Sequence, residues 1–222
     1  MDEIISADEL HVPLLEPSSE SCNESIVALK NAWICEVCAP EILPYEAELI
    51  DDINSQLKER QNILDVERED PDEIFSANMY QMEANRIKYS LSKYLRTRLQ
   101  KIEAFVHHIL ENQEIRDRLS EVELNYAQTY RELVKSHMDA TVLSHLHKNF
   151  RQLNKVDRDE DMVPRPELDR FVIFRVKQEV ENFLVNDEAG SEEVQNLEEG
   201  DIHIMRYQRI KGLLLEQKIE LI

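Results

Sequence analysis

The sequence predicts an α+β protein: a mostly α-helical N-terminal domain, a helical bundle with one long helix, followed by a small β-rich C-terminal domain. Two observations predict this class. Apolar residues first recur at three-to-four spacing over several long segments, and after a charged linker they recur at every second position. The 222 residues suffice for one medium domain and one small one. We expect an acidic flexible tail (1–20), a helical domain (21–153), a charged linker (154–166) and a β-rich domain (167–222).

Helical periodicity indicates four helices in the first domain. The first begins near Ser25, and the second covers about 46–64, with acids at its start and bases near its end. The third covers about 74–111, which is about 55 Å at 1.5 Å per residue. A small domain cannot cover all of such a helix, so we expect another chain to cover part of it. The fourth begins at a Ser120-x-x-Glu123 capping box and ends before Leu146.

The C-terminal segment has strand-like alternation and an acidic loop at 187–200. The expected β segments are 171–176, 181–185, 203–207, 210–215 and 218–222. A β domain of about 55 residues is marginal by itself. We therefore expect it to dock on another surface, with the apolar pair Leu221 and Ile222 closing its sheet.

Composition and charge exclude several classes of function. The chain has 26 basic and 46 acidic residues, a net charge of −20, which disfavours tight binding of duplex nucleic acid over the whole surface. Its three glycines are too far apart for a GxGxxG fingerprint or a phosphate-binding loop. No apolar run reaches the length of a membrane span. The N-terminus has no secretory signal pattern, and three cysteines cannot all pair, so we expect a reducing compartment, nuclear or cytosolic.

Catalytic and metal-binding patterns are weak. Cys35-x-x-Cys38 is a lone CxxC, and a structural zinc site needs four ligands, so packing on an apolar helix face is favoured over a metal or redox role. The sequence contains no HExxH and no GxSxG motif. We expect no catalytic residue, no cofactor and no metal. An acidic metal-dependent enzyme is the least favoured alternative.

One segment is locally basic. Residues 86–101 contain six lysines and arginines and no acid, with Tyr89 and Tyr94 interleaved. A polar helix face that complements acids nearby explains this pattern, as does helix packing in which arginine stems cover apolar surface. The functional alternative is a single-strand or junction DNA-binding module, in which arginines grip the backbone and tyrosines stack on bases. The basic residues are Arg86, Lys88, Lys93, Arg96, Arg98 and Lys101.

The N-terminal tail combines acids with a few apolar residues. One interpretation is a solvating tail, and the other is a short linear motif that folds into a partner's groove. The candidate residues for such a motif are Asp2, Glu3, Ile4, Ile5 and Leu10.

Three stretches of the chain resemble one protein family. Residues 82–103 are similar to the long-helix stretch of the Sld-five-type subunit of the GINS family. Residues 28–33 with 39–43 are similar to its first helix and the following turn, and 163–168 with 171–176 to its entry into the β domain. The resemblance covers about 26–222, and the order of the two domains also agrees with this subunit type.

The resemblance implies a non-catalytic scaffold subunit in a hetero-tetramer of four related GINS subunits. Such a complex joins the MCM ring and a further cofactor to form the CMG helicase, which acts in initiation and elongation of DNA replication in the nucleus. DNA contact would be indirect or weak, and there would be no membrane contact. The tail resembles a motif that binds a trimeric replisome hub, although Leu10 is displaced from the expected spacing.

From this resemblance we assign subunit-interface residues. Arg86, Tyr89, Tyr94 and Arg98 are expected on or beside the helical interface between subunits. Leu221 and Ile222 are expected to anchor the β domain, which would dock against a sister subunit.

Overall fold

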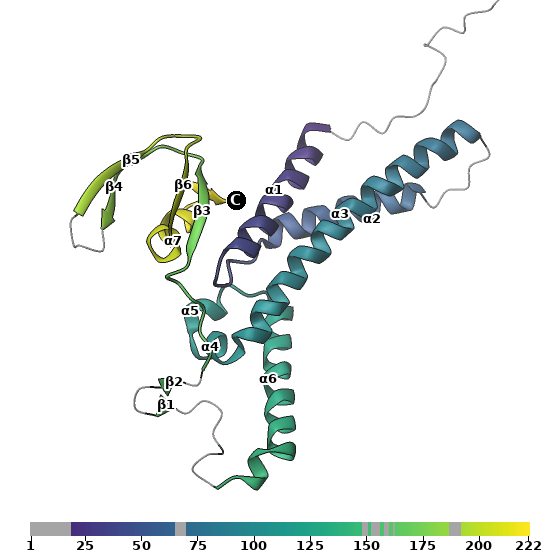
Figure 1. Ribbon diagram of the computed structural model, residues 1–222. Coiled ribbons are helices and arrows are strands. Elements are labelled where there is room, and N and C mark those ends of the chain that lie inside the picture. The colour runs from purple at the N-terminus through teal and green to yellow at the C-terminus, as the bar shows by residue number, and fades with distance from the viewer. Residues whose placement is uncertain are drawn as a thin grey trace, which may run out of the picture.

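A computed structural model describes residues 19–64, 70–147, 151, 156–157, 160–161, 163–186 and 192–222. Helices form one part of the molecule and a small antiparallel sheet with one helix forms the other (Figure 1). The α+β class predicted from the sequence is confirmed. The proposed tail motif, residues 2–10, lies outside the described residues.

Three helices form the upper part of the helical domain: α1 (Ser19–Cys38), α2 (Ala47–Leu64) and α3 (Pro71–Ala104). The Asp70 side chain caps α3 by accepting a hydrogen bond from the Asp72 backbone N–H, and Pro71 stands at its first turn, where a missing N–H costs nothing. The apolar stripes of the three helices meet in one core. Its buried members are Leu29, Ile50, Ile53, Leu57, Ala84, Ile87, Leu91 and Tyr94.

The long helix predicted over 74–111 is not continuous. It ends at Ala104, and α4 (Val106–Glu111) and α5 (Gln113–Arg116) follow. Phe105 leaves the helical conformation, with φ −120° and ψ 26°. The sequence has no proline or glycine here, so its periodicity runs through the break. The break allows the residues after it to enter a second core, whose buried members are Ile42, Ile102, Val106, Ile109, Ile115 and Ala127.

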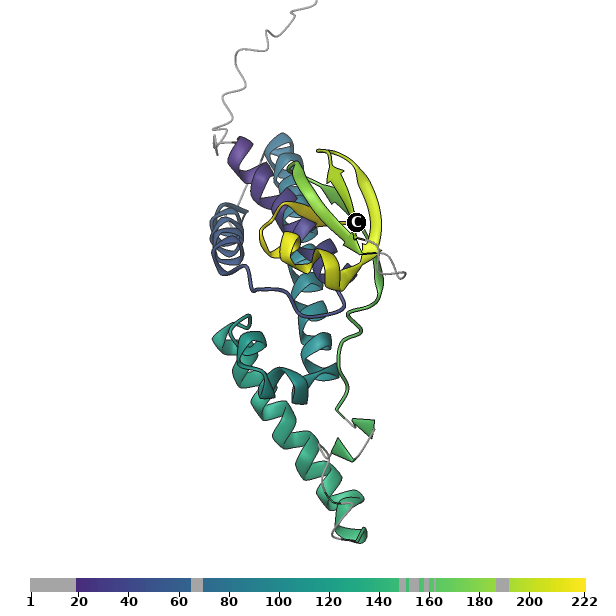
Figure 2. The same ribbon diagram turned by 90° about the vertical axis from the view of Figure 1, so that its left-hand side faces the viewer.

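The last long helix is α6 (Glu121–Thr141), followed by a 3₁₀ turn, η1 (Leu143–His145). The predicted capping box is confirmed: Ser120 Oγ accepts from the Glu123 backbone N–H, and the Glu123 carboxylate accepts from the Ser120 backbone N–H. Both views show α6 running away from the other helices (Figures 1 and 2).

The C-terminal domain is built on one long bent hairpin. β3 (Phe171–Val176) pairs with β6 (Ile202–Arg206), and β4 (Val180–Asn186) pairs with β5 (Glu192–Leu197). β7 (Ile219–Leu221) joins the other edge of β3, giving the order β6–β3–β7. In the linker region, Val156–Asp157 and Glu160–Asp161 form a two-residue ladder, β1 with β2.

Two predictions for this domain are wrong. The expected acidic loop at 187–200 contains strand β5, because pairing with β4 stabilises a segment whose acids hide its pattern. The expected β segment at 210–215 belongs to a helix, α7 (Tyr207–Leu215). Tyr207, Ile210 and Leu214 lie on one buried helical face, and the leucines on either side of Leu214 obscure this spacing.

Candidate functional site

Arg98 lies at the centre of a buried cluster of charged residues. Its side chain is fully buried, and its five N–H donors make five hydrogen bonds to acceptors on α1, α6 and two loops. The Glu123 carboxylate accepts two of them, from Nε at 2.7 Å and from Nη2 at 3.0 Å. The others go to Glu36 Oε2 at 3.1 Å, Leu43 O at 2.7 Å and Arg118 O at 3.2 Å.

Lys101 lies one turn further along α3 and reaches the same segment of chain. Its ammonium donates to Glu36 Oε1 and to Glu41 O, both at 2.8 Å, and to the backbone carbonyl of Glu36. Arg98 and Lys101 therefore share the buried Glu36 carboxylate and fix the end of α1 against α3.

Glu41 joins the two domains. Its carboxylate accepts hydrogen bonds from Tyr207 Oη at 3.0 Å and Lys211 Nζ at 2.9 Å, both on α7. On the side of the helical domain, Arg118 Nη1 lies 3.2 Å from Glu41 Oε1. This carboxylate is only 4% exposed, so both domains hold it in a site with little access to solvent.

Apolar contacts continue the junction beside Glu41. Cys35 and Cys38 of α1, together with Ala39, pack on the core of the small domain, which includes Phe174. The Cys38 thiol also lies 3.4 Å from the carbonyl oxygen of Ile222, to which it donates. The cover that we expected for the undersized domain thus comes, at least in part, from its own chain.

Burial and charge set the protonation states at the junction. Burial alone would lower the pKa of Arg98, but the hydrogen bond to Glu123 and the charge of Glu36 outweigh it, so the pKa is raised. Burial lowers the pKa of Lys101 although Glu36 opposes this. Burial, and then Glu41, raise the pKa of Tyr207, whose hydroxyl remains a neutral donor. The arrangement binds the two domains together.

Comparisons with known proteins agree on one family. A family model described as "GINS complex protein helical bundle domain" matches residues 45–142, and one described as "DNA replication complex GINS protein SLD5 C-terminus" matches 166–222. The proteins named "DNA replication complex GINS protein SLD5" in Rattus norvegicus and Homo sapiens are 37% and 36% identical to this chain over 207 residues, 90% of this chain and 89% of theirs. The chain belongs to the SLD5 family of GINS proteins. The Arabidopsis thaliana protein of that name is 36% identical over 197 residues, 87% of this chain and 89% of its own.

The predicted interface residues of this SLD5-family chain differ in their exposure to solvent. Arg86 and Tyr89 are exposed on α3. Tyr94 and Arg98 are buried inside the chain, and a side chain without accessible surface cannot touch a partner directly. Leu221 is buried in the core of the small domain, whereas Ile222 is 45% exposed.

The six cations of the basic segment 86–101 fall into a buried group and a more exposed group. Arg98 and Lys101 belong to the internal cluster, so they are the polar face complementing nearby acids that the sequence offered as one interpretation. Arg86, Lys88 and Arg96 are exposed and Lys93 is half-buried. The DNA-binding alternative therefore loses two of its six cations.

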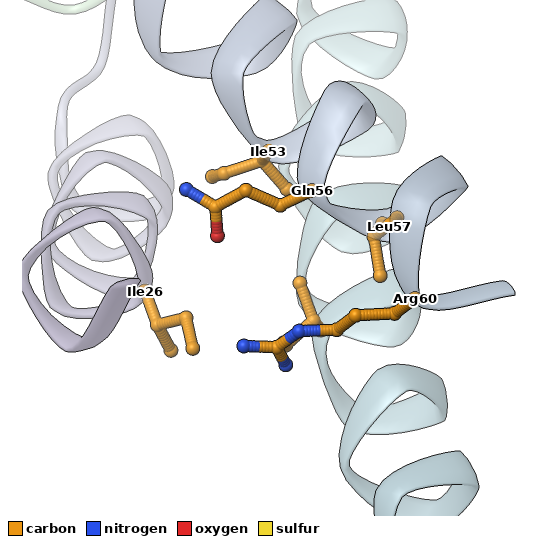
Figure 3. A pocket seen from close by; sticks show the side chains of 6 residues that line it. Ile26, Ile53, Gln56, Leu57 and Arg60 are labelled. Carbon is orange, nitrogen blue, oxygen red and sulfur yellow. The ribbon is translucent and has the colours of Figure 1, made fainter. Parts of the chain in front are cut away.

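A shallow recess lies between α1, α2 and α3 of this SLD5-family chain. Ile26, Ile53, Gln56, Leu57, Arg60 and Ile87 line it (Figure 3). Its empty space is about 190 Å³ with open solvent included, less than the roughly 300 Å³ of small ligand pockets. We interpret it as a gap in helix packing.

The described residues contain neither a candidate metal site nor a candidate membrane-spanning helix. Among them no group of three or more His, Cys, Asp or Glu side chains is arranged to hold a metal ion. No helix among them has the length and hydrophobicity to cross a membrane.

Sequence reasoning missed the acids of the junction. Glu36 and Glu41 were not singled out, because in a chain with 46 acids no single carboxylate is conspicuous. Their partner Lys211 was expected on a β segment and was not singled out either. Glu123 was identified only as a capping residue. The capping box and the run of bases on one helix were the two available signals.

Proposed function

We propose that this chain is a non-catalytic scaffold subunit of a hetero-tetrameric GINS complex. Within that complex it would help to assemble and activate the MCM-containing CMG helicase in the initiation and elongation of DNA replication, in the nucleus. Its partners would be three sister GINS subunits, the MCM ring and the further CMG cofactor. The names of the relatives, which refer to a DNA replication complex, support this role.

The single observation that carries the proposal is the bare end of α6. From Lys135 to Val142 every residue is exposed, a stretch of about two helical turns. Leu133, just before this stretch, and Met138 within it are exposed apolar residues. An isolated helix of this length is marginal in water because packing supplies most helical stability. A partner helix that covers these residues would supply the packing that this end of α6 lacks.

The N-terminal half of α3 is also largely exposed. The first buried residue of this helix is Ala84, thirteen positions after its start. Phe75, Met79 and Met82 are more than half exposed there, and Tyr89 continues the same helical stripe. The exposed residues Arg86 and Tyr89 thus remain proposed contacts with a sister subunit.

Co-expression tests this proposal. The chain would be produced with three candidate sister subunits, and the native mass of the purified particle measured. We expect a stoichiometric four-chain particle. The variant Leu133→Glu should reduce its recovery, whereas Gln128→Glu, which adds the same charge to another exposed face of α6, should not.

The outcome that contradicts the proposal is a well-behaved monomer that ignores the three sister chains. The tail proposal, binding of a replisome hub through residues 2–10, needs its own test. Deletion of these residues should abolish capture of the trimeric hub by the intact complex and leave the four-chain particle unchanged.

A further inference from the structure

The outer face of the small sheet is apolar where water would favour polar residues. Five side chains on it are each 44–64% exposed; four belong to the adjacent strands β3 and β6, and the fifth directly follows β7. A solvent-facing side of an antiparallel sheet ordinarily carries polar side chains. The five are Phe171, Ile173, Ile202, Ile204 and Ile222.

The strand register places these residues next to one another. Ile173 is directly opposite Ile204 on the neighbouring strand, and Phe171 and Ile202 lie one pleat to either side on their strands. On the other edge, the Ile222 backbone N–H donates to Ile173 O at 3.0 Å. The five side chains therefore form one patch rather than scattered exposures.

The patch adjoins helix α1 across the domain boundary. Asn31 Nδ2 donates to Glu220 Oε2 at 3.4 Å, and Cys38 Sγ donates to Ile222 O at 3.4 Å. Ile34, which is 40% exposed, lies three positions after Asn31 and four before Cys38, so it belongs to the same stripe of α1. Both views place α1 beside the sheet at its C-terminal strand (Figures 1 and 2).

Charge indicates what kind of chain can cover this patch. Arg175, Lys177 and Arg206 stand at its rim, against Glu220 and Asp169 as their acidic partners. The rim therefore has a basic excess in a chain whose net charge is −20. Two copies of so acidic a chain repel one another, which disfavours self-association through this face. A different chain with acids around an apolar centre is complementary to it.

We propose that Ile34 of α1 and the five sheet residues form a docking surface for a different GINS subunit, one that presents an apolar segment with an acidic rim. This proposal rests on the proposed function, and it adds the surface and the chemistry of the partner. Because the surface crosses from α1 to the sheet, it depends on the orientation of the two domains, which the contacts of Glu41 help to hold.

Photo-cross-linking of the assembled complex tests the surface. A photo-reactive phenylalanine would replace Ile204 in the full chain, and in a matched control it would replace Leu215, an exposed residue of α7, the helix that packs on the opposite side of the sheet. We expect a cross-link from position 204 to one sister subunit and none from position 215. The absence of a cross-link from 204 in an intact four-chain particle overturns the proposal, and so does a cross-link to a second copy of this chain.

A charge variant gives the second readout. Ile204→Glu should lower the affinity of the contacted subunit about tenfold or more, because it places an unpaired acid opposite an acidic rim. Leu215→Glu should leave the affinity unchanged, and both variants should keep the thermal unfolding midpoint of the free chain. Equal affinity for the two variants refutes the surface. If no particle forms even with the unaltered chain, the proposed function fails first, and this surface proposal fails with it.

Discussion

Arg98 and Glu123 form a bidentate ion pair in the interior of the chain, with Nε–Oε1 at 2.7 Å and Nη2–Oε2 at 3.0 Å. The same Glu123 closes the capping box with Ser120 at the start of α6. One carboxylate thus fixes both where α6 begins and how it meets α3. The direction of the exposed half of α6, and with it the surface offered to a partner, depends on this pair.

Truncation of Arg98 should destabilise the free chain strongly. Arg98→Ala leaves the buried Glu123 carboxylate without its cation and leaves Glu36 with Lys101 alone, and breaking a buried pair in this way costs about 3–5 kcal/mol. Arg98→Lys should recover only part of this loss, since an ammonium has three donors for five acceptor positions. The free energy of unfolding from urea titration measures both effects.

The matched control for Arg98 is Arg96→Ala on the exposed side of the same helix. Its effect should stay within about 0.5 kcal/mol. A loss for Arg98→Ala no larger than this control would mean that the buried cluster does not stabilise the fold. Any effect of Arg98 on complex assembly is then expected to follow its effect on folding, because the side chain has no surface to offer.

Replacement of Glu41 should loosen the small domain without unfolding the helices. Glu41→Ala removes the acceptor of Tyr207 and Lys211 and leaves Arg118 without that carboxylate. We expect faster amide hydrogen exchange in 171–176 and 202–221 and faster proteolysis in the linker 154–166, while the α3 core stays protected. The exposed acid Glu199, changed to Ala, serves as control. Uniform loss of protection in both domains would contradict a role confined to the junction.

Alkaline pH should destabilise the chain through Tyr94. Burial raises the pKa of Tyr94 to about 12, above the ordinary tyrosine value of 10.0, although Arg98 nearby opposes the shift. The folded state therefore holds this proton more tightly than the unfolded chain. The stability it contributes is complete below pH 10 and is lost as the pH rises towards 12.

The variant Tyr94→Phe isolates this effect. Between pH 9 and pH 12 the free energy of unfolding of the wild-type chain should fall by about 2 kcal/mol more than that of Tyr94→Phe. Arg98, Glu36 and Glu123 lie near Tyr94 in the wild-type chain and are unchanged in the variant, so effects that do not involve the Tyr94 hydroxyl largely cancel in the difference. Parallel pH profiles for the two proteins would show that the Tyr94 hydroxyl titrates alike in the folded and unfolded chain.

Features that depend on residues close together in the sequence were predictable, and features that depend on contacts between distant residues were not. The Ser120–Glu123 capping box and strand 171–176 depend on residues a few positions apart, so they were visible in the sequence. The break at Phe105 has no local signature, because tertiary packing of Val106 and Ile109 stabilises it. Arg98 was predicted on or beside a subunit interface, and the structure buries it although charged residues are ordinarily exposed. Its acceptors Glu36 and Glu123 lie 62 and 25 positions away, so only the fold brings them together.

The remaining cations of α3 should not make the free chain a DNA-binding protein. Four are available outside the buried cluster, so phosphate contacts from this segment could give a salt slope no steeper than about −4 for duplex DNA. The net charge of −20 opposes even this contact. We expect no duplex or single-strand binding at about 0.15 M salt in fluorescence anisotropy. Binding that weakens steeply with salt, and is lost when Arg86, Lys88, Lys93 and Arg96 are changed to Ala but kept in Arg98→Lys, would instead establish the exposed face of α3 as a nucleic-acid contact.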